Sequence, residues 1–143
     1  TASGQFANKG WKFSLLTSLT WQRDLNRTDP KDEETYDKPI CYSPTLSYGI
    51  TAIAAWKGLS LTVSNLHVGE RMWSYADPED ILKPYDNIDM KLSYDTTIMR
   101  KSGKPICTGL CLEINDLLDE QYEHIPRYPM PGRNYKLTLV VGI

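Results

Sequence analysis

Few residues of this sequence have the type and spacing that catalysis or metal binding requires. The only histidines, His67 and His124, lie in different predicted hairpins, so neither has an evident partner for general-base or metal chemistry. The acidic run from Asp29 to Asp37 lacks the ligand spacing and the glycine of a calcium loop, so we interpret it as a solvated loop. Glycine-rich phosphate loops, Gly-x-Ser-x-Gly elbows and zinc spacings are absent. The sequence therefore predicts no enzyme, no metal site and no cofactor.

The three cysteines are an odd number, so they cannot all pair within the chain. Cys107 and Cys111 are four residues apart, which is about 13 Å along an extended strand and too far for a disulfide. We predict that Cys41, Cys107 and Cys111 are free thiols. We also predict that Cys107 and Cys111 lie on the polar face of one strand.

Aromatic and arginine side chains in the predicted loops are better candidates for binding. Trp73, Tyr75, Arg127 and Tyr128 lie in or beside two long loops, and aromatic residues with arginine recur at binding hot spots. Packing within the loops, or a place in an aromatic girdle, explains these residues at least as well. The chain has 9 Tyr and 4 Trp against 2 Phe, and rings with a polar atom favour boundaries between dry and wet regions.

Composition excludes two further classes of protein. The 143 residues include 16 Lys and Arg against 18 Asp and Glu, a net charge of -2, so no basic field attracts nucleic acid. The longest unbroken apolar run is Ala52 to Trp56, whereas a membrane-spanning helix needs about 20 residues. Thr1 to Gly10 lacks the basic start and apolar stretch of a signal peptide, so the N-terminus indicates no localisation.

The elements that position these residues are predicted to be six strands. Apolar and polar residues alternate with a period of two in six runs, at residues 11–22, 45–56, 59–64, 87–95, 106–115 and 134–143. Only Lys57 and Gly58 separate the second run from the third, which indicates a tight hairpin. We predict that Ile88, Met90, Leu92 and Tyr94 share one face with Leu59, Leu61 and Val63 of the neighbouring strand.

Long and short connections alternate along the chain. The long ones cover about residues 24–41, 74–84 and 120–133, and the short ones cover residues 57–58 and 100–104. Long loops therefore lie at one end of the sheet and short turns at the other. Residues 1–143 are predicted to form one all-β, antiparallel up-and-down meander without an internal domain boundary. Short helices at residues 78–82 and 116–125 are an alternative for two of the loop segments.

Alternation alone does not distinguish a soluble sheet from a membrane barrel. Trp11 and Trp21 lie ten residues apart on one face, which spans roughly 23 Å of membrane normal on a tilted strand, close to the apolar band of an outer-membrane barrel. Trp56 ends its strand at the short-turn end, as a girdle residue does. The opposite face is mostly polar and suits a lumen. A soluble β-sandwich with Trp and Tyr in its core is the competing interpretation.

Two motifs of the last third carry a resemblance to a known family. The segment from Glu113 to Tyr122, with the Pro-Gly-Arg-Asn-Tyr element that ends at Tyr135, resembles the C-terminal end of TonB-dependent outer-membrane receptors. The segments at residues 19–29 and 68–71 are also similar to strand ends of this family. The resemblance looks closest to vitamin, haem or siderophore receptors of Bacteroidetes-like bacteria. The chain departs from the family in ending with Ile143, where an aromatic residue is usual.

The resemblance implies a place in the bacterial outer membrane. The chain would be the C-terminal segment of a 22-stranded transmembrane β-barrel, without the plug domain. Its function would be energised import of a nutrient such as a siderophore, haem or cobalamin. The implied partners are the remaining strands and plug of the same receptor, a TonB-type energy-coupling protein that contacts the missing N-terminal part, outer-membrane lipid and the small-molecule ligand.

The same resemblance implies an orientation. The long loops that carry Trp73, Tyr75, Arg127 and Tyr128 would face outside and meet the ligand. The turns at residues 57–58 and 100–104 would face the periplasm. A soluble β-sandwich binding module is the second hypothesis. An outer-membrane enzyme of the esterase type is the third, and it requires a Ser–His pair for which neither histidine has an evident partner.

Overall fold

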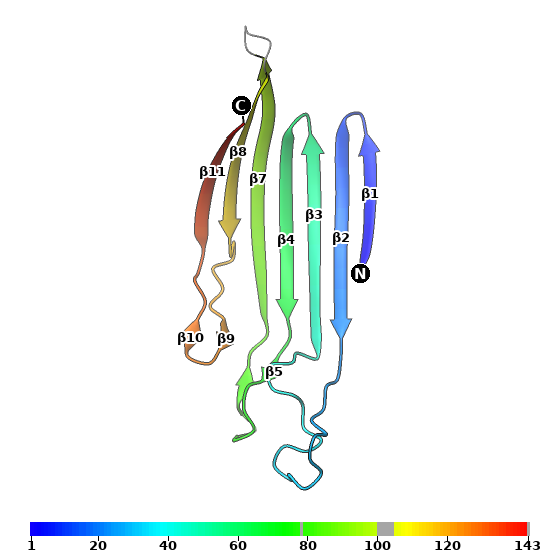
Figure 1. The fold of residues 1–143 in the computed structure, drawn as a ribbon, viewed down its shortest axis with the longest axis vertical. Helices are drawn as coiled ribbons and strands as arrows, with labels where there is room; N and C mark the ends of the chain where they lie inside the picture. The colour runs from blue at the N-terminus through cyan, green and yellow to red at the C-terminus, as the bar shows by residue number, and fades with distance from the viewer. Residues whose placement is uncertain (78, 100–104, 143) are drawn as a thin grey trace.

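The computed structural model describes residues 1–77, 79–99 and 105–142 (Figure 1). In this part of the chain all regular elements are strands. Their bounds are β1 Ala2–Asn8, β2 Trp11–Trp21, β3 Leu46–Trp56, β4 Leu59–Val68, β5 Arg71–Met72, β6 Ile81–Leu82, β7 Tyr85–Met99, β8 Pro105–Asn115, β9 Glu123–Ile125, β10 Tyr128–Pro129 and β11 Asn134–Gly142. The described residues include no helix with the length and hydropathy needed to cross a membrane.

Seven of the strands form one antiparallel sheet in the order β1-β2-β3-β4-β7-β8-β11. Each strand pairs with its neighbour along the chain, apart from the short hairpins β5–β6 and β9–β10, which are inserted after β4 and β8. Figure 1 shows tight turns at one end of the sheet and the long connections, with both short hairpins, at the other. The predicted all-β antiparallel meander is confirmed, and so is the separation of long loops from short turns.

The register of β4 on β7 is the predicted one. Leu59, Leu61 and Val63 face Tyr94, Leu92 and Met90 across the two strands. Opposed residues of an antiparallel pair share a face of the sheet, so both sets lie together. The same rule extends the apolar face over all seven strands. One of its rows consists of Phe6, Phe13, Ala54, Leu61, Leu92, Leu112 and Leu137.

The apolar face of this sheet has no cover among the described residues. Leu139 is 71% exposed, Leu19 is 68% exposed and Phe6 is 62% exposed, values typical of surface side chains. The buried hydrophobic residues of the described chain are Leu82 and Tyr85, and both lie at the long-loop end. The sheet is therefore a single layer. The small core of the described residues lies at its long-loop end, around Leu82 and Tyr85.

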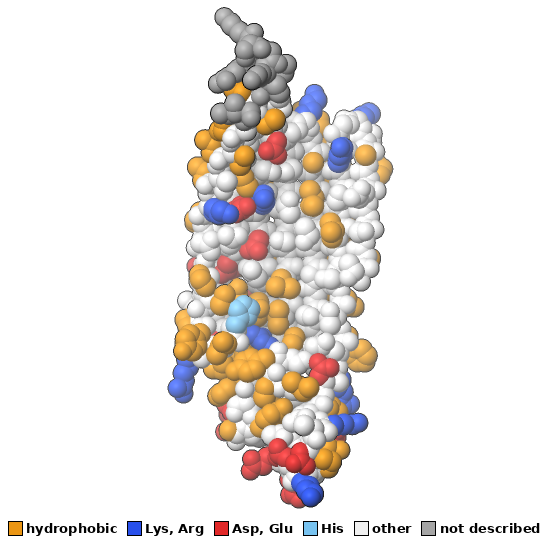
Figure 2. All heavy atoms as spheres, in the orientation of Figure 1, with side chains coloured by type: hydrophobic (Ala, Val, Ile, Leu, Met, Phe, Trp, Pro, Cys, Tyr) orange, Lys and Arg blue, Asp and Glu red, His pale blue; other side chains and the backbone are white. Residues whose placement is uncertain are grey.

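The opposite face carries polar groups that bond to one another across strands. Ser60 and Ser93 share a hydrogen bond of 2.7 Å between β4 and β7. Glu113 on β8 lies 3.4 Å from the Nζ of Lys91 and 3.1 Å from the Nζ of Lys136, so one carboxylate joins three strands. Figure 2 shows this polar face, where hydrophobic side chains are sparse over the strands and gather near the long-loop end.

The cysteine prediction is confirmed. Cys41, Cys107 and Cys111 are all free. Cys111 faces Ser93 and Cys107 faces Thr97 across the β7–β8 pair, which places both thiols on the polar face.

One expectation about the elements is wrong, and one alternative is excluded for the described residues. The sheet has seven strands rather than six, because β1 was not predicted; its apolar face bears Gly4 and Asn8, which break the alternating pattern. The helices considered at residues 78–82 and 116–125 do not form in the described part, where Ile81–Leu82 is β6 and Glu123–Ile125 is β9. The predicted turn at residues 100–104 lies outside the described residues.

Replacement of Gly58 by alanine is expected to lower the free energy of unfolding by about 1–3 kcal/mol. Gly58 has a φ of +85°, and a Cβ there would meet the carbonyl oxygen of Asp95 on β7. Gly4→Ala on β1 is the matched control, because nothing lies within 4 Å of the added carbon. Denaturant unfolding followed by tryptophan fluorescence compares the two variants. Equal unfolding midpoints for Gly58→Ala and Gly4→Ala would show that the turn at Gly58 does not require glycine.

Candidate ligand-contact site at the long-loop end

The two short hairpins enclose a cavity where the long loops meet. Its volume is about 370 Å³, and it is lined by Ile81, Leu82, Lys83, Pro84, Gln121, Tyr122, Glu123 and Pro129. The lining combines an aromatic ring, a cation, a carboxylate and an amide with aliphatic side chains. Such a mixture of apolar walls and a few polar groups is typical of small-molecule sites. We take this cavity and the residues that support it as the candidate site.

A cluster of three rings supports the cavity. The rings of Tyr85 and Tyr122 are stacked, with centroids 4.0 Å apart. His124 meets both edge-on, at 5.5 Å from Tyr85 and 5.4 Å from Tyr122. The Nδ1 of His124 lies 3.2 Å from the hydroxyl of Tyr85. Tyr85 is only 3% exposed, and its buried ring holds the stacked ring of Tyr122 in place where Tyr122 lines the cavity.

Arg71 ties the first hairpin to the second. Its guanidinium lies over the ring of Tyr85, with Cζ 5.5 Å from the ring centroid. Its Nη2 donates a 2.9 Å hydrogen bond to the backbone oxygen of Glu123 on β9. The side chain is 6% exposed. A buried cation between a ring and a carbonyl holds β5 and β9 at the fixed separation that shapes the cavity.

Carboxylates determine how the chain leaves β8. Asp116 has a φ of 53°, and its amide donates to Oδ1 of Asp89 on β7. Oδ1 of Asp116 accepts the amide of Glu120, and Oδ1 of Asp119 accepts the amide of Arg133 just before β11. These short side chains satisfy backbone donors that no strand partner reaches. They turn the chain back over the end of β7 and place Gln121 and Tyr122 against the first hairpin.

Burial and local charge both raise the pKa of the Tyr122 hydroxyl. Partial burial raises the pKa of this phenol, and the negative charges of Asp116, Asp89 and Glu120 raise it further. Ionisation of Tyr122 would add a fourth negative charge to the same region, so it requires a pH above the ordinary pKa of a tyrosine side chain. At neutral pH Tyr122 therefore presents a neutral hydroxyl that can both donate and accept hydrogen bonds.

The four residues predicted to contact ligand lie in the two hairpin regions. Trp73 and Tyr75 are half-buried in the β5–β6 connection, where the amide of Trp73 donates to the oxygen of Asp80. Burial raises the pKa of the Tyr75 phenol, and a hydrogen bond with Cys41 raises it further. Arg127 and Tyr128 are exposed at the tip of the second hairpin, and the Arg127 amide donates to the Glu123 carboxylate.

The structure does not bring these four side chains into one group. Among the described residues no hydrogen bond, ion pair or ring contact joins Trp73 or Tyr75 to Arg127 or Tyr128. The lining of the cavity contains none of the four. Their hairpins are joined instead by Arg71, so the predicted residues flank the cavity while others line it.

Sequence reasoning missed the residues that line or support the cavity because they come from separate segments. Arg71, Tyr85 and Tyr122 are brought together only by the two inserted hairpins, which have no periodic signal of their own. A signal was nevertheless present. Two of the segments that carry the family resemblance end at Arg71 and at Tyr122; Tyr122 belongs to the ring cluster, and the Arg71 guanidinium lies over the Tyr85 ring of that cluster.

The two histidines occupy different environments. His67 is stacked on Tyr48 with centroids 4.7 Å apart, and its Nδ1 lies 3.1 Å from Oδ2 of Asp86. His124 belongs to the ring cluster. Across residues 1–77, 79–99 and 105–142, no three His, Cys, Asp or Glu side chains are grouped closely enough to hold a metal ion. The acidic loop around Asp32 is exposed, and a hydrogen bond from Thr35 lowers the pKa of Asp32.

The arrangement can hold a small molecule by shape, ring contact and a few polar bonds. Lys83 and Glu123 offer one charge of each sign, and Tyr122 offers a ring face and a hydroxyl. Searches of protein-family models and of curated proteins return no match for this chain.

Proposed function

We propose that the chain is the C-terminal part of the transmembrane β-barrel of a TonB-dependent outer-membrane receptor, which imports a nutrient such as a siderophore, haem or cobalamin. The observation that carries the proposal is the single-layer sheet with one bare apolar face and one hydrogen-bonded polar face. In water, large exposed apolar patches are costly. In a bilayer the same face meets lipid and the polar face meets a water-filled lumen.

The dimensions of the strands support a membrane location. β2, β3 and β8 each have 11 residues, and a membrane-crossing β-strand needs about 9–11. Trp11 and Trp56 are stacked at the short-turn end with centroids 5.6 Å apart, and Trp21 ends β2 at the long-loop end. Aromatic rings at both ends of an apolar band are typical of the two membrane interfaces.

The soluble sandwich is less well supported. A sandwich buries the inner faces of two sheets against each other. Beyond the seven-stranded sheet, the described residues form only two hairpins of two strands each, and these lie at the loop end rather than over the apolar face (Figure 1). A second sheet would therefore have to come from outside the described residues.

The unpaired edges indicate the immediate partners. β1 and β11 each pair on one side only, so each leaves a row of free backbone groups. In lipid each such group costs several kcal/mol, and closure into a barrel removes the cost. The proposed partners are the remaining strands of the same receptor, together with its plug and a TonB-type energy-coupling protein. The long-loop end, with the candidate site, would face outside and contact the ligand.

Cysteine labelling in intact cells tests this orientation. In a background with Ser at positions 41, 107 and 111, Lys57→Cys and Arg127→Cys place one thiol at each end of the sheet, both at exposed positions. A membrane-impermeant maleimide is expected to label Arg127→Cys on intact cells, and Lys57→Cys only after the outer membrane is opened. The reverse pattern would overturn the orientation, and labelling of both in intact cells would overturn the membrane-spanning proposal.

Transport requires the whole receptor. Seven strands do not close a barrel around a ligand-sized lumen, and the proposed plug and coupling contact lie outside this segment. In cells that lack the receptor, the full-length protein is expected to restore ligand uptake, and residues 1–143 alone are expected to restore none. Uptake by the short chain would contradict the assignment.

A further inference from the structure

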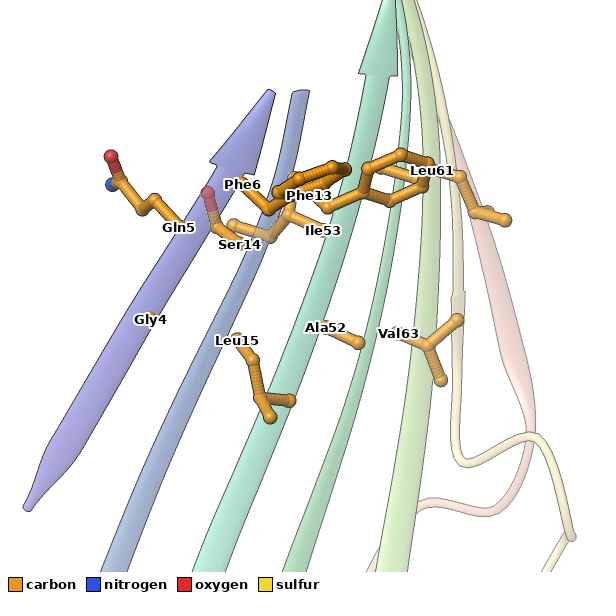
Figure 3. A pocket seen from close by; sticks show the side chains of 11 residues that line it. Gly4, Gln5, Phe6, Phe13, Ser14, Leu15, Ala52, Ile53, Leu61 and Val63 are labelled. Atoms are coloured by element: carbon orange, nitrogen blue, oxygen red, sulfur yellow. The ribbon is translucent and has the colours of Figure 1, made fainter. Parts of the chain in front are cut away.

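A hollow on the apolar face of the sheet follows the line of β3. Ala52 and Ala54 on β3 are smaller than the residues opposite them on both neighbouring strands, which are Phe13 and Leu15 on β2 and Leu61 and Val63 on β4. The hollow has a volume of about 530 Å³. In Figure 3 the rings of Phe6 and Phe13 lie above it and Leu15 and Val63 below, while Gln5 points to the opposite side of the sheet.

A second hollow continues the first towards the short-turn end. It has a volume of about 480 Å³ and is lined by Phe6, Asn8, Lys9, Trp11 and Phe13. Phe6 and Phe13 line both hollows, so the two adjoin at these rings; we call the pair of hollows the apolar groove, and its second hollow reaches a lysine. Lys9 lies in the tight turn between β1 and β2 and is exposed.

A second lysine lies at the same end of the groove. The Nζ of Lys57 is 4.7 Å from the centroid of the Trp56 ring. A Cβ at Gly10, beside Lys9, would lie 3.8 Å from that same ring, so the turns that carry the two lysines converge on Trp56. Neither lysine forms an ion pair with a residue in the described part of the chain. Lys9 therefore lines the end of the groove, and Lys57 lies over Trp56, whose ring is stacked on the Trp11 ring that lines the same hollow.

We propose that this groove binds one membrane phospholipid with an anionic headgroup, its acyl chain along Ala52 and Ala54 and its phosphate between Lys9 and Lys57. The charge pattern selects this occupant, because an apolar slot that ends in two cations matches an acyl chain that ends in a phosphate. The Trp11 and Trp56 rings lie at the junction, where indoles favour the boundary between acyl chains and headgroups. The inference rests on the proposed function, since it requires the apolar face to meet lipid.

Tryptophan quenching by brominated lipids tests the site. The full receptor is reconstituted in phosphatidylcholine that contains a minor fraction of brominated phosphatidylglycerol or, at the same fraction, brominated phosphatidylcholine. The quenching at Trp11 and Trp56 is the difference between the receptor and its variant with Trp11→Phe and Trp56→Phe. Brominated phosphatidylglycerol is expected to quench more strongly than brominated phosphatidylcholine. The apparent affinity for the anionic lipid, relative to phosphatidylcholine, should fall roughly fivefold in Lys9→Gln and again in Lys57→Gln. Equal quenching by both lipids in the unchanged chain would overturn the inference.

Two variants test the groove itself. Ala54→Leu fills it and is expected to reduce quenching by the anionic lipid, whereas Ala55→Leu adds the same carbons on the polar face and is expected to change nothing. Unchanged circular dichroism confirms that each variant folds. If Trp11 and Trp56 become less accessible to the brominated lipids as the protein concentration rises, a second copy of the chain occupies the groove, and the lipid site is overturned. Absence of quenching in bilayers made wholly of brominated phosphatidylcholine would instead overturn the proposed membrane location.

Discussion

Replacement of Leu137 by lysine is expected to cost about 2–4 kcal/mol of folding free energy in a bilayer. Leu137 lies close to the middle of β11 on the apolar face, opposite Leu112. Its side chain is 70% exposed, so in water the same substitution would be nearly neutral. In lipid the ammonium group would have to be desolvated or displaced towards the interface, and this cost follows from the proposed orientation of the sheet.

Thr138→Lys is the matched control, because residue 138 is on the same strand but points to the polar face, opposite Cys111. Its free energy of folding is expected to change by less than about 0.5 kcal/mol. Folding of the full receptor into vesicles, followed by denaturant titration, measures both variants. Equal and small costs for the two lysines would indicate that the apolar face does not meet lipid.

Replacement of Tyr85 by alanine is expected to destabilise the long-loop end by about 3–5 kcal/mol. Tyr85 is one of the two buried hydrophobic residues of the described chain, and its ring contacts Tyr122, His124 and Arg71. Loss of the ring leaves a hole beneath the cavity and exposes the Arg71 guanidinium on one side. The two hairpins should then open without unfolding the central strands, because they contribute little to the main sheet.

Hydrogen exchange distinguishes local from global opening. In Tyr85→Ala the amides of β9 and of Tyr128 on β10 should lose most of their protection while those of β3 and β4 keep theirs. Tyr85→Phe removes only the hydroxyl that contacts His124, so its cost should be about 1 kcal/mol. If both variants lose protection equally over the whole sheet, the ring cluster is not the local support described above.

The strands could be predicted because their signal is local. A strand with one apolar face alternates with a period of two, and β2, β3 and β7 follow this rule closely enough to define both face and register. β1 does not, since Gly4 and Asn8 stand where apolar residues were required. It forms because the Lys9–Gly10 turn, with positive φ at both residues, folds it back onto β2.

The segment after β8 shows why a helical spacing of apolar residues does not lead to a helix in this loop. Leu117, Leu118 and Tyr122 have helical spacing, but Asp116 and Asp119 adopt positive φ, which a helix does not allow. Their carboxylates instead accept backbone amides and fold the chain into turns. The ring cluster could not be predicted either, because its members are assembled by tertiary contacts between inserted hairpins.

The order of strands in the sheet also bears on how the chain folds. Each long strand pairs with the next long strand of the chain. The β1–β2 and β3–β4 pairings close tight turns, whereas β2–β3, β4–β7 and β8–β11 close the long connections. The two hairpins with tight turns have the most local contacts of the sheet, so they are expected to form first. β3 and β4 form such a unit around residues 57–58, and its neighbours can add on either side. The sheet is therefore expected to grow by addition of neighbouring strands to a hairpin that has already formed.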